Sequence, residues 1–240
     1  MRVPLPQIKK HDLTYYLIIS KMKKIKDEYK KELLLDKHNY QVMMEWEKPY
    51  MKALVNKLKP TGDVLEIGFG LGYSANQIQQ YKIKSHTIIE ANPYVLKKLK
   101  TWAKKQKHKV NVIEGTWQNK LKTLGTFDII FFDDSPHEEH HDEDNTRLYD
   151  LYHQLITKHV NKNARMTWYC EVCIYWVTHP STLWSLEPFK IKIPDNCRYI
   201  VPRVRLSHTL FIPLLIFVEG IVPYIIPFVI NNRNQFFIRQ

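Results

Sequence analysis

The residues best suited to chemistry lie between positions 64 and 90 of this 240-residue chain. An apolar run that contains Glu66 leads into three closely spaced glycines, and residues 73–81 have the pattern of a helix. Glycine lets the backbone approach a bound ligand, and the start of a helix offers unpaired N–H groups. A second apolar run ends at Glu90, whose carboxylate is placed to accept both hydroxyls of a ribose. The spacing predicts binding of a nucleotide-type cofactor.

The residues around the glycines indicate which nucleotide. A dinucleotide fingerprint would have a third glycine at position 73 and a phosphate over the helix start. This chain has Tyr73 there, and Glu66 stands two residues before Gly68. An acid repels a pyrophosphate but suits a cation such as a sulfonium, so a dehydrogenase is disfavoured. The pattern resembles motif I of the S-adenosylmethionine-dependent methyltransferases; a turn that serves only packing is the alternative.

Further acids and thioethers are placed to act beside this cofactor. The apolar run 127–132 ends at Asp133, and ligands of open α/β sheets bind at the carboxyl ends of strands. Asp128 lies at the other end of the same run and is expected far from the site. Upstream, Met43 and Met51 are candidates to cover the adenine or the sulfonium, and Glu47 between them is a candidate to face the acceptor.

Alternating strands and amphipathic helices must position these residues. The pattern over 60–175 predicts an α/β fold with a doubly wound, mostly parallel, Rossmann-like sheet. Amphipathic helices are expected at 93–105 and 146–159. Apolar residues from Ile18 to Leu33 at helical spacing, among many lysines, predict a basic N-terminal helical extension. We therefore expect an extension over 1–40, a cofactor-binding domain over 41–202 and a hydrophobic tail over 203–240.

Composition bounds the partners and the compartment. The net charge is +12, with lysines concentrated near the N-terminus and over 97–109. Such a face can bind membranes, nucleic acid or an acidic partner, but the lysines lack interleaved stacking aromatics, so we expect a solvated face and no nucleic acid. Three cysteines and no visible signal peptide indicate a reducing, cytoplasmic location. A redox or metal pair at Cys170 and Cys173, and a metal site in the histidine-rich loop 136–144, are the less favoured alternatives, so no metal is expected.

Several motifs of the chain resemble the guanidinoacetate N-methyltransferase family. The block Trp46-Glu47-Lys48-Pro49-Tyr50-Met51 is the most specific of them, whereas the glycine turn is shared by many methyltransferases. The other matching segments are Val64 to Gly70, Ile88-Ile89-Glu90, the helix of Trp102, His108-Lys109-Val110, Gly115-x-Trp117, Phe127-Asp128-x-x-x-x-Asp133, Tyr169-Cys170 and Ile193 to Tyr199. The match is dense from about 41 to 136.

The resemblance implies a class I methyltransferase fold that uses S-adenosylmethionine to convert guanidinoacetate to creatine. Asp133 and Glu47 would be catalytic and would grip the planar guanidine cation from two sides. Backbone amides near Val172 and Cys173 would hold the carboxylate of the acceptor. The expected cofactor contacts are Met43, Met51, Glu66, Gly68, Phe69, Gly70, Leu71, Gly72, Tyr73, Glu90, Ala91, Asn92, Trp117, Gln118 and Asp133.

The chain also departs from the family pattern. No tryptophan precedes Trp46 to cap the cofactor, Asp134-Ser135 replaces a Thr-Tyr pair, and the interval from Cys170 to Cys197 is short, which suggests a missing or rebuilt late helix and strand. The apolar segment 209–230 reaches bilayer length, but Glu219 and three prolines disfavour a membrane span. Two functional alternatives remain, namely a protein arginine N-methyltransferase of this family and a cofactor-binding module without turnover. A DNA base methylase is disfavoured, and a monomer or homodimer is expected.

Overall fold

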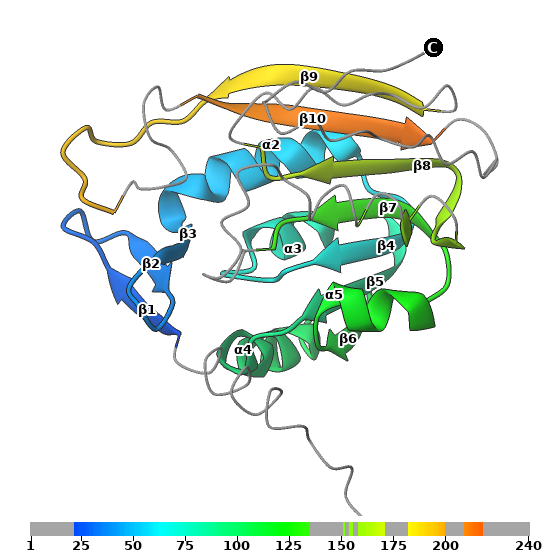
Figure 1. The fold of residues 1–240 in the computed structure, drawn as a ribbon, viewed down its shortest axis with the longest axis horizontal. Coiled ribbons are helices and arrows are strands. Elements are labelled where there is room, and N and C mark those ends of the chain that lie inside the picture. The colour runs from blue at the N-terminus through cyan, green and yellow to red at the C-terminus, as the bar shows by residue number, and fades with distance from the viewer. Residues whose placement is uncertain are drawn as a thin grey trace, which may run out of the picture.

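A seven-stranded sheet forms the centre of the computed structural model (Figure 1). The structure describes residues 22–134, 151, 154–155, 158–170, 182–199 and 209–217. The strands of the sheet are β4 (Gly62–Ile67), β5 (Ile83–Glu90), β6 (Lys109–Glu114), β7 (Phe127–Phe132), β8 (Val160–Trp168), β9 (Thr182–Lys190) and β10 (Thr209–Phe217). Their order is β6-β5-β4-β7-β8-β10-β9. The first five are parallel and β10 is antiparallel to both neighbours, which confirms the predicted mostly parallel sheet.

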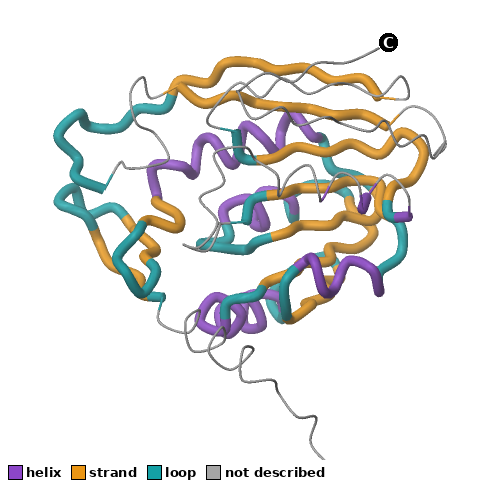
Figure 2. The backbone as a smooth tube through the Cα atoms, viewed as in Figure 1, coloured by secondary structure: helices purple, strands orange, loops and turns teal. Residues whose placement is uncertain are grey.

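Helices cover both faces of this sheet, as a doubly wound fold requires (Figure 2). They are α2 (Lys48–Leu58), α3 (Tyr73–Ile78), α4 (Pro93–Ala103) and α5 (Trp117–Lys120), with 3-10 turns η1 (Glu45–Glu47) and η2 (Leu121–Thr123). The first three pack on one face, and α5 packs on the other with Leu151 and Leu155. The helices expected at 73–81 and 93–105 are confirmed, although both end earlier. Of the helix expected at 146–159, residues 151, 154, 155 and 158 are described and helical.

The N-terminal helical extension was a wrong prediction over its described part. Residues 22–44 form a three-stranded antiparallel sheet of β1 (Lys23–Lys26), β2 (Glu32–Leu35) and β3 (Gln41–Met44). The reason lies in β2, where Leu33 packs with α2 on one side while Leu34 packs with α4 on the other. A strand buried on both faces has consecutive apolar residues, which also fit a helical stripe.

This small sheet stands at the carboxyl ends of β4 and β7, on the left in Figure 1. Asp27, in the turn between β1 and β2, ties it to its surroundings and is only 6% exposed. Its carboxylate accepts hydrogen bonds from the backbone N–H of Lys31 (2.7 Å), from Nε1 of Trp46 (2.9 Å) and from Sγ of Cys197 (3.6 Å). Burial raises the pKa of the Cys197 thiol, which keeps the thiol protonated as a donor. The Asp27 carboxylate thus joins the turn between β1 and β2 to the segment of Cys197 and to Trp46, which precedes Glu47 in the chain.

We expect Asp27→Ala to lower the free energy of unfolding by about 2–3 kcal/mol. The change leaves the indole N–H of Trp46 and the backbone N–H groups of Tyr29 and Lys31 without their acceptor. Chemical denaturation followed by tryptophan fluorescence measures this change. The neighbouring variant Glu28→Ala is the control, because the exposed Glu28 carboxylate contacts only Arg198 among the described residues. Equal stability of the two variants would contradict the central role of Asp27.

The hydrophobic segment expected as a tail begins with an inner strand of the sheet. Residues 209–217 form β10, which pairs along its whole length with β9 and at Leu215 and Ile216 with β8. The boundary expected at 202 therefore does not separate a tail from the sheet, and the two late strands of the fold are present as β9 and β10. Within the described residues, no helix is long and apolar enough to cross a membrane. Residues 218–230 of the segment lie outside the described ranges.

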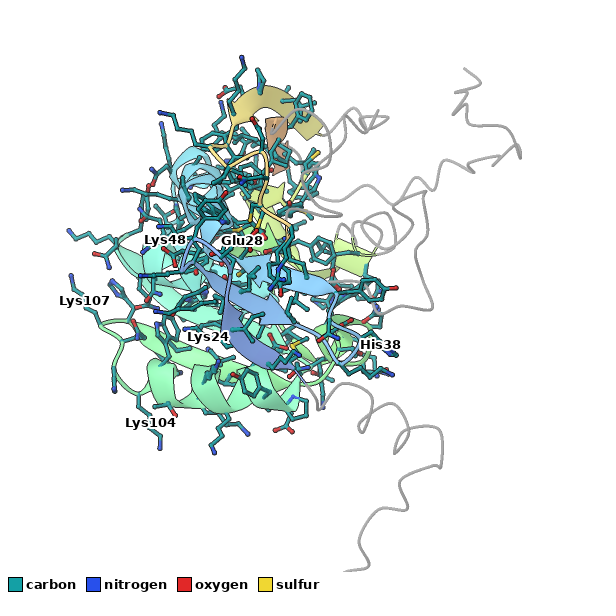
Figure 3. All side chains as sticks on the ribbon, turned by 90° about the vertical axis from the view of Figure 1, so that its left-hand side faces the viewer. Lys24, Glu28, His38, Lys48, Lys104 and Lys107 are labelled. Atoms are coloured by element: carbon teal, nitrogen blue, oxygen red, sulfur yellow. The ribbon has the colours of Figure 1, made fainter. Side chains whose placement is uncertain are left out.

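Lysines gather on the face made by the small sheet and α4. Lys24, Lys48, Lys104 and Lys107 all project from the side of the molecule shown in Figure 3. Some of these charges are balanced locally, since Lys24 pairs with Glu32 and Lys100 with Glu114 (3.0 Å). Whether this basic face binds a partner is not tested by these contacts, so a solvated face stays a prediction.

Candidate active site

The glycine turn between β4 and α3 brings two strand ends into close contact. Gly68 has a φ of +87°, and a Cβ there would lie 2.1 Å from the carbonyl oxygen of Asp133. Glycine is required at position 68 because any side chain would collide with the end of β7. The backbone N–H of Asp133 donates to the carbonyl of Ile67 (2.9 Å), which continues the pairing of β4 and β7. The turn and Asp133 consequently form one unit.

Glu90, at the end of β5, anchors this turn. Its carboxylate accepts hydrogen bonds from the backbone N–H of Phe69 (2.9 Å) and of Asn92 (2.7 Å). Burial raises the pKa of Glu90, although backbone N–H groups around it favour the carboxylate. Asn92 in turn caps α4 through Oδ1, which accepts the N–H of Tyr94 (2.9 Å). The turn, the end of β5 and the start of α4 are thus held together by one carboxylate.

These groups fit a polar nucleoside cofactor. The Glu90 carboxylate lies at the glycine turn, where ribose hydroxyls would bind beside its contacts with the amides of Phe69 and Asn92. The Tyr73 hydroxyl is buried and has no hydrogen-bond partner among the described residues. An orphaned buried hydroxyl is costly, and a polar group of a bound ligand would satisfy it. Residues of the turn, Tyr73 and Glu90 would hold such a cofactor.

The other residues expected to contact the cofactor differ in position. Met43 of β3 lies on the turn, where its Sδ accepts the N–H of Leu71 (3.2 Å). Trp117, at the start of α5, donates from Nε1 to Asp134 (3.0 Å), while the neighbouring Gln118 is exposed. Met51 of α2 is 0% exposed and packs in the core with Leu33 of β2 and Val64 of β4. Its contact with the cofactor stays a prediction.

Glu66 does not have the open position that its place beside the turn suggested. Its carboxylate is 0% exposed and contacts the Ser74 hydroxyl on one side and Nε2 of His86 (2.8 Å) on the other. Gln79 places its Nε2 3.3 Å from Nδ1 of His86. Because that amide N–H can only donate, Nδ1 accepts, so the hydrogen of the neutral ring is on Nε2, the nitrogen that contacts Glu66. The expectation that Glu66 faces a sulfonium is corrected to a buried link between β4, α3 and β5.

We expect His86→Leu to lower the free energy of unfolding by about 3 kcal/mol, because it leaves a buried carboxyl without its imidazole partner. Chemical denaturation of His86→Leu, Glu66→Leu and the double variant forms a double-mutant cycle. The double variant is expected to lose less than the sum of the single variants. Additive losses would show that the two side chains do not stabilise the fold as a pair.

Glu47 and Asp133 lie on different elements that meet near Tyr50. Glu47 ends η1, is 0% exposed and accepts the backbone N–H of Met44 (3.0 Å). Asp133 follows β7 and is 9% exposed. Burial raises the pKa of Tyr50 well above its ordinary value, and the charges of Asp133 and Glu47 add to this effect. Tyr50 follows Glu47 by three residues and its hydroxyl accepts the N–H of Cys170, while the N–H of Tyr169 donates to the carbonyl of Phe132 (3.1 Å), next to Asp133. The segments that carry the two carboxylates therefore meet around Tyr50.

No role for Tyr50 was predicted from the sequence. Its side chain lies where α2 meets the segments of β8 and β10. The Tyr50 hydroxyl bonds to the backbone carbonyl of Phe211 and accepts the N–H of Cys170 (3.1 Å). It therefore joins α2 to the ends of β8 and β10. The only signal in the sequence is its place within the block of Trp46 to Met51. Val172, Cys173 and the histidine-rich loop 136–144 lie outside the described residues.

The chain is similar to known methyltransferases. The family model of guanidinoacetate N-methyltransferase matches residues 20–178. Protein arginine N-methyltransferase 2 of Candida glabrata is 39% identical over 137 residues, covering 54% of this chain and 33% of the relative. The Saccharomyces cerevisiae protein of the same name is 36% identical over 138 residues, covering 54% and 34%. The chain thus spans about a third of the length of these curated relatives.

Solved structures show the same fold at low sequence identity. Spermidine synthase of Thermotoga maritima aligns with a TM-score of 0.53 at 11% identity, covering 84% of this chain and 73% of the synthase. An O-methyltransferase of Streptomyces achromogenes, solved with S-adenosylmethionine, has a TM-score of 0.50 at 12% identity and covers 72% and 80%. The family match extends over well more than half of the chain. The chain therefore belongs to the guanidinoacetate N-methyltransferase family of S-adenosylmethionine-dependent methyltransferases.

Proposed function

We propose that this methyltransferase transfers the methyl group to a nitrogen of a guanidino group. The observation that carries the proposal is that the segments of two buried carboxylates, Glu47 and Asp133, meet around Tyr50, through the hydrogen bond of its hydroxyl with Cys170 and that of Tyr169 with Phe132. A guanidinium ion is planar, always charged and rich in N–H donors, so it pairs with carboxylates in a two-pronged geometry. Two carboxylates in one low-exposure region favour such a cation over a neutral acceptor.

The reaction can be written in terms of these side chains. Bound S-adenosylmethionine supplies an electrophilic methyl carbon on a sulfonium. The guanidino nitrogen would gain this methyl carbon as the C–S bond breaks, and the proton that it loses would pass to the Asp133 carboxylate. Glu47 fixes the plane of the guanidine, and Asp133 orients the reacting N–H and accepts its hydrogen bond. A carboxylate of ordinary pKa is a poor base for so weak an acid, so orientation contributes more than early proton removal.

Two acceptors follow from the comparisons. The relatives from Candida glabrata and Saccharomyces cerevisiae are named protein arginine N-methyltransferase 2, which supports an arginine side chain in a protein as the acceptor. The family description and the block from Trp46 to Met51 support guanidinoacetate, the acceptor that the sequence analysis favoured. We infer that arginine in a protein is the better candidate because the identity to those enzymes extends over 137 residues.

Methyl transfer from labelled S-adenosylmethionine tests both acceptors in one assay. Guanidinoacetate and an arginine-containing peptide compete for the label, and a peptide with citrulline in place of arginine is the control, since citrulline keeps the shape but lacks the cation. We expect label in the arginine peptide and none in the citrulline peptide. Label only in creatine would move the assignment to guanidinoacetate. Cofactor binding without transfer to any guanidine would overturn the proposed activity and leave a cofactor-binding module.

A further inference from the structure

A bulge in the small N-terminal sheet turns Gln41 toward Glu47. Leu33 pairs with Met44 and Leu34 with Met43, but Leu35 pairs with Gln41, so β3 contains one extra residue at position 42. A bulge of this kind shifts the side chain next to it, here that of Gln41, to the other face of the strand. Gln41 is consequently 6% exposed, and its Nε2 lies 3.4 Å from Oε1 of Glu47.

The chemistry of Glu47 fixes which end of the Gln41 amide faces it. An ionised carboxylate only accepts hydrogen bonds, so the NH₂ group must point toward Glu47. The carbonyl oxygen Oε1 then points away, where it is buried and accepts no hydrogen bond from the described residues. A buried amide oxygen without a donor costs free energy, and such a group in a folded protein calls for an explanation.

We propose that Gln41 is a specificity-determining residue whose Oε1 accepts an N–H of the acceptor guanidinium while its Nε2 positions Glu47. This inference rests on the proposed guanidino acceptor. A guanidinium group carries up to five N–H donors. Two carboxylates that also bond to other groups do not accept all of these donors. Oε1 of Glu47 already accepts the N–H of Met44 and the Gln41 amide, so the neighbouring Gln41 Oε1 adds an acceptor to those that Glu47 offers the cation. The orphaned oxygen gains the donor that it lacks.

Gln41→Met tests this role, because methionine has a similar length and no polar group. The measurement is the affinity for an arginine-containing peptide, and separately for guanidinoacetate, by calorimetry in the presence of S-adenosylhomocysteine. We expect the affinity for the guanidine to fall about tenfold or more, as for a lost hydrogen bond to a charged group. The affinity for S-adenosylhomocysteine is expected to stay within a few-fold. Unchanged guanidine affinity in a folded variant would overturn the inference.

Two further variants separate this role from general packing. Gln79→Met makes the same change at a buried glutamine that contacts His86 and is 5% exposed. It should lower the melting temperature without changing guanidine affinity. Gln41→Glu keeps an acceptor, because a proton shared with Glu47 makes one carboxyl mimic the amide. It should retain guanidine affinity within a few-fold, and a loss equal to that of Gln41→Met would contradict the acceptor role.

The binding measurement also distinguishes this inference from the proposed function. If the wild-type protein binds neither guanidinoacetate nor the arginine peptide, both proposals fail. If it binds and methylates a guanidine while Gln41→Met binds equally well, only the role of Gln41 fails. A wild-type protein that binds the guanidine without methylating it still reports on Gln41 through the binding affinities.

Discussion

Replacing Asp133 by Asn is expected to lower the rate of methyl transfer by about 10³-fold while the Kd for S-adenosylmethionine changes by no more than a few-fold. Asn has the same shape, so the backbone contact of residue 133 with Ile67 and the close approach to Gly68 are preserved. The amide has lost the charge that accepts the reacting N–H. Single-turnover kinetics with a guanidine acceptor measure the rate, and calorimetry measures cofactor affinity.

The matched control for this prediction lies on the same strand. Asp128 stands at the amino end of β7, where its side chain accepts the N–H of Asp63 (2.8 Å) and Nδ2 of Asn161 (2.7 Å). Asp128→Asn is the same chemical change at the opposite edge of the sheet, so it should reduce stability and leave the rate within a few-fold. If Asp133→Asn instead loses cofactor binding, Asp133 serves the cofactor rather than the acceptor.

The sequence was sufficient to predict the centre of the fold. The apolar runs that become β4, β5 and β7 end at Gly68, Glu90 and Asp133, and parallel strands bring their carboxyl ends to one edge. Local residue patterns therefore predicted the fold class and the region of the site. The detailed partners were not predictable, because Glu66 contacts His86 across the register of two neighbouring strands. A pattern along one strand carries no information about that neighbour.

Two segments were misinterpreted for a shared physical reason. β10 is apolar because it lies inside the sheet between β8 and β9, and a strand buried on both faces has no polar alternation. Such a run resembles a membrane segment. The consecutive leucines of β2 are buried between α2 and α4 in the same way and were assigned to a helix. In both cases burial on two faces, which depends on tertiary packing, removed the periodicity that distinguishes strands from helices.

Replacing Glu90 by Ala is expected to weaken S-adenosylmethionine binding by more than tenfold, which corresponds to about 1.5–3 kcal/mol for hydrogen bonds to a charged group. Part of this loss would be indirect, because Ala also removes the acceptor of the Phe69 and Asn92 amides and loosens the turn. Isothermal calorimetry below the melting temperature of the variant gives the affinity. Glu114→Ala is the control, since Glu114 ends the neighbouring strand β6 opposite Glu90 but pairs with Lys100 at the surface.

A cofactor analogue separates the direct part from the indirect one. The wild-type protein should bind S-adenosylhomocysteine about tenfold more tightly than its 2′-deoxyribose analogue, because one charged hydrogen bond to Glu90 is lost with the hydroxyl. In Glu90→Ala the two ligands should bind equally, since the carboxylate that distinguishes them is gone. If the variant still discriminates tenfold, the ribose contacts another residue, and Glu90 acts only by holding the Phe69 amide and the turn in place.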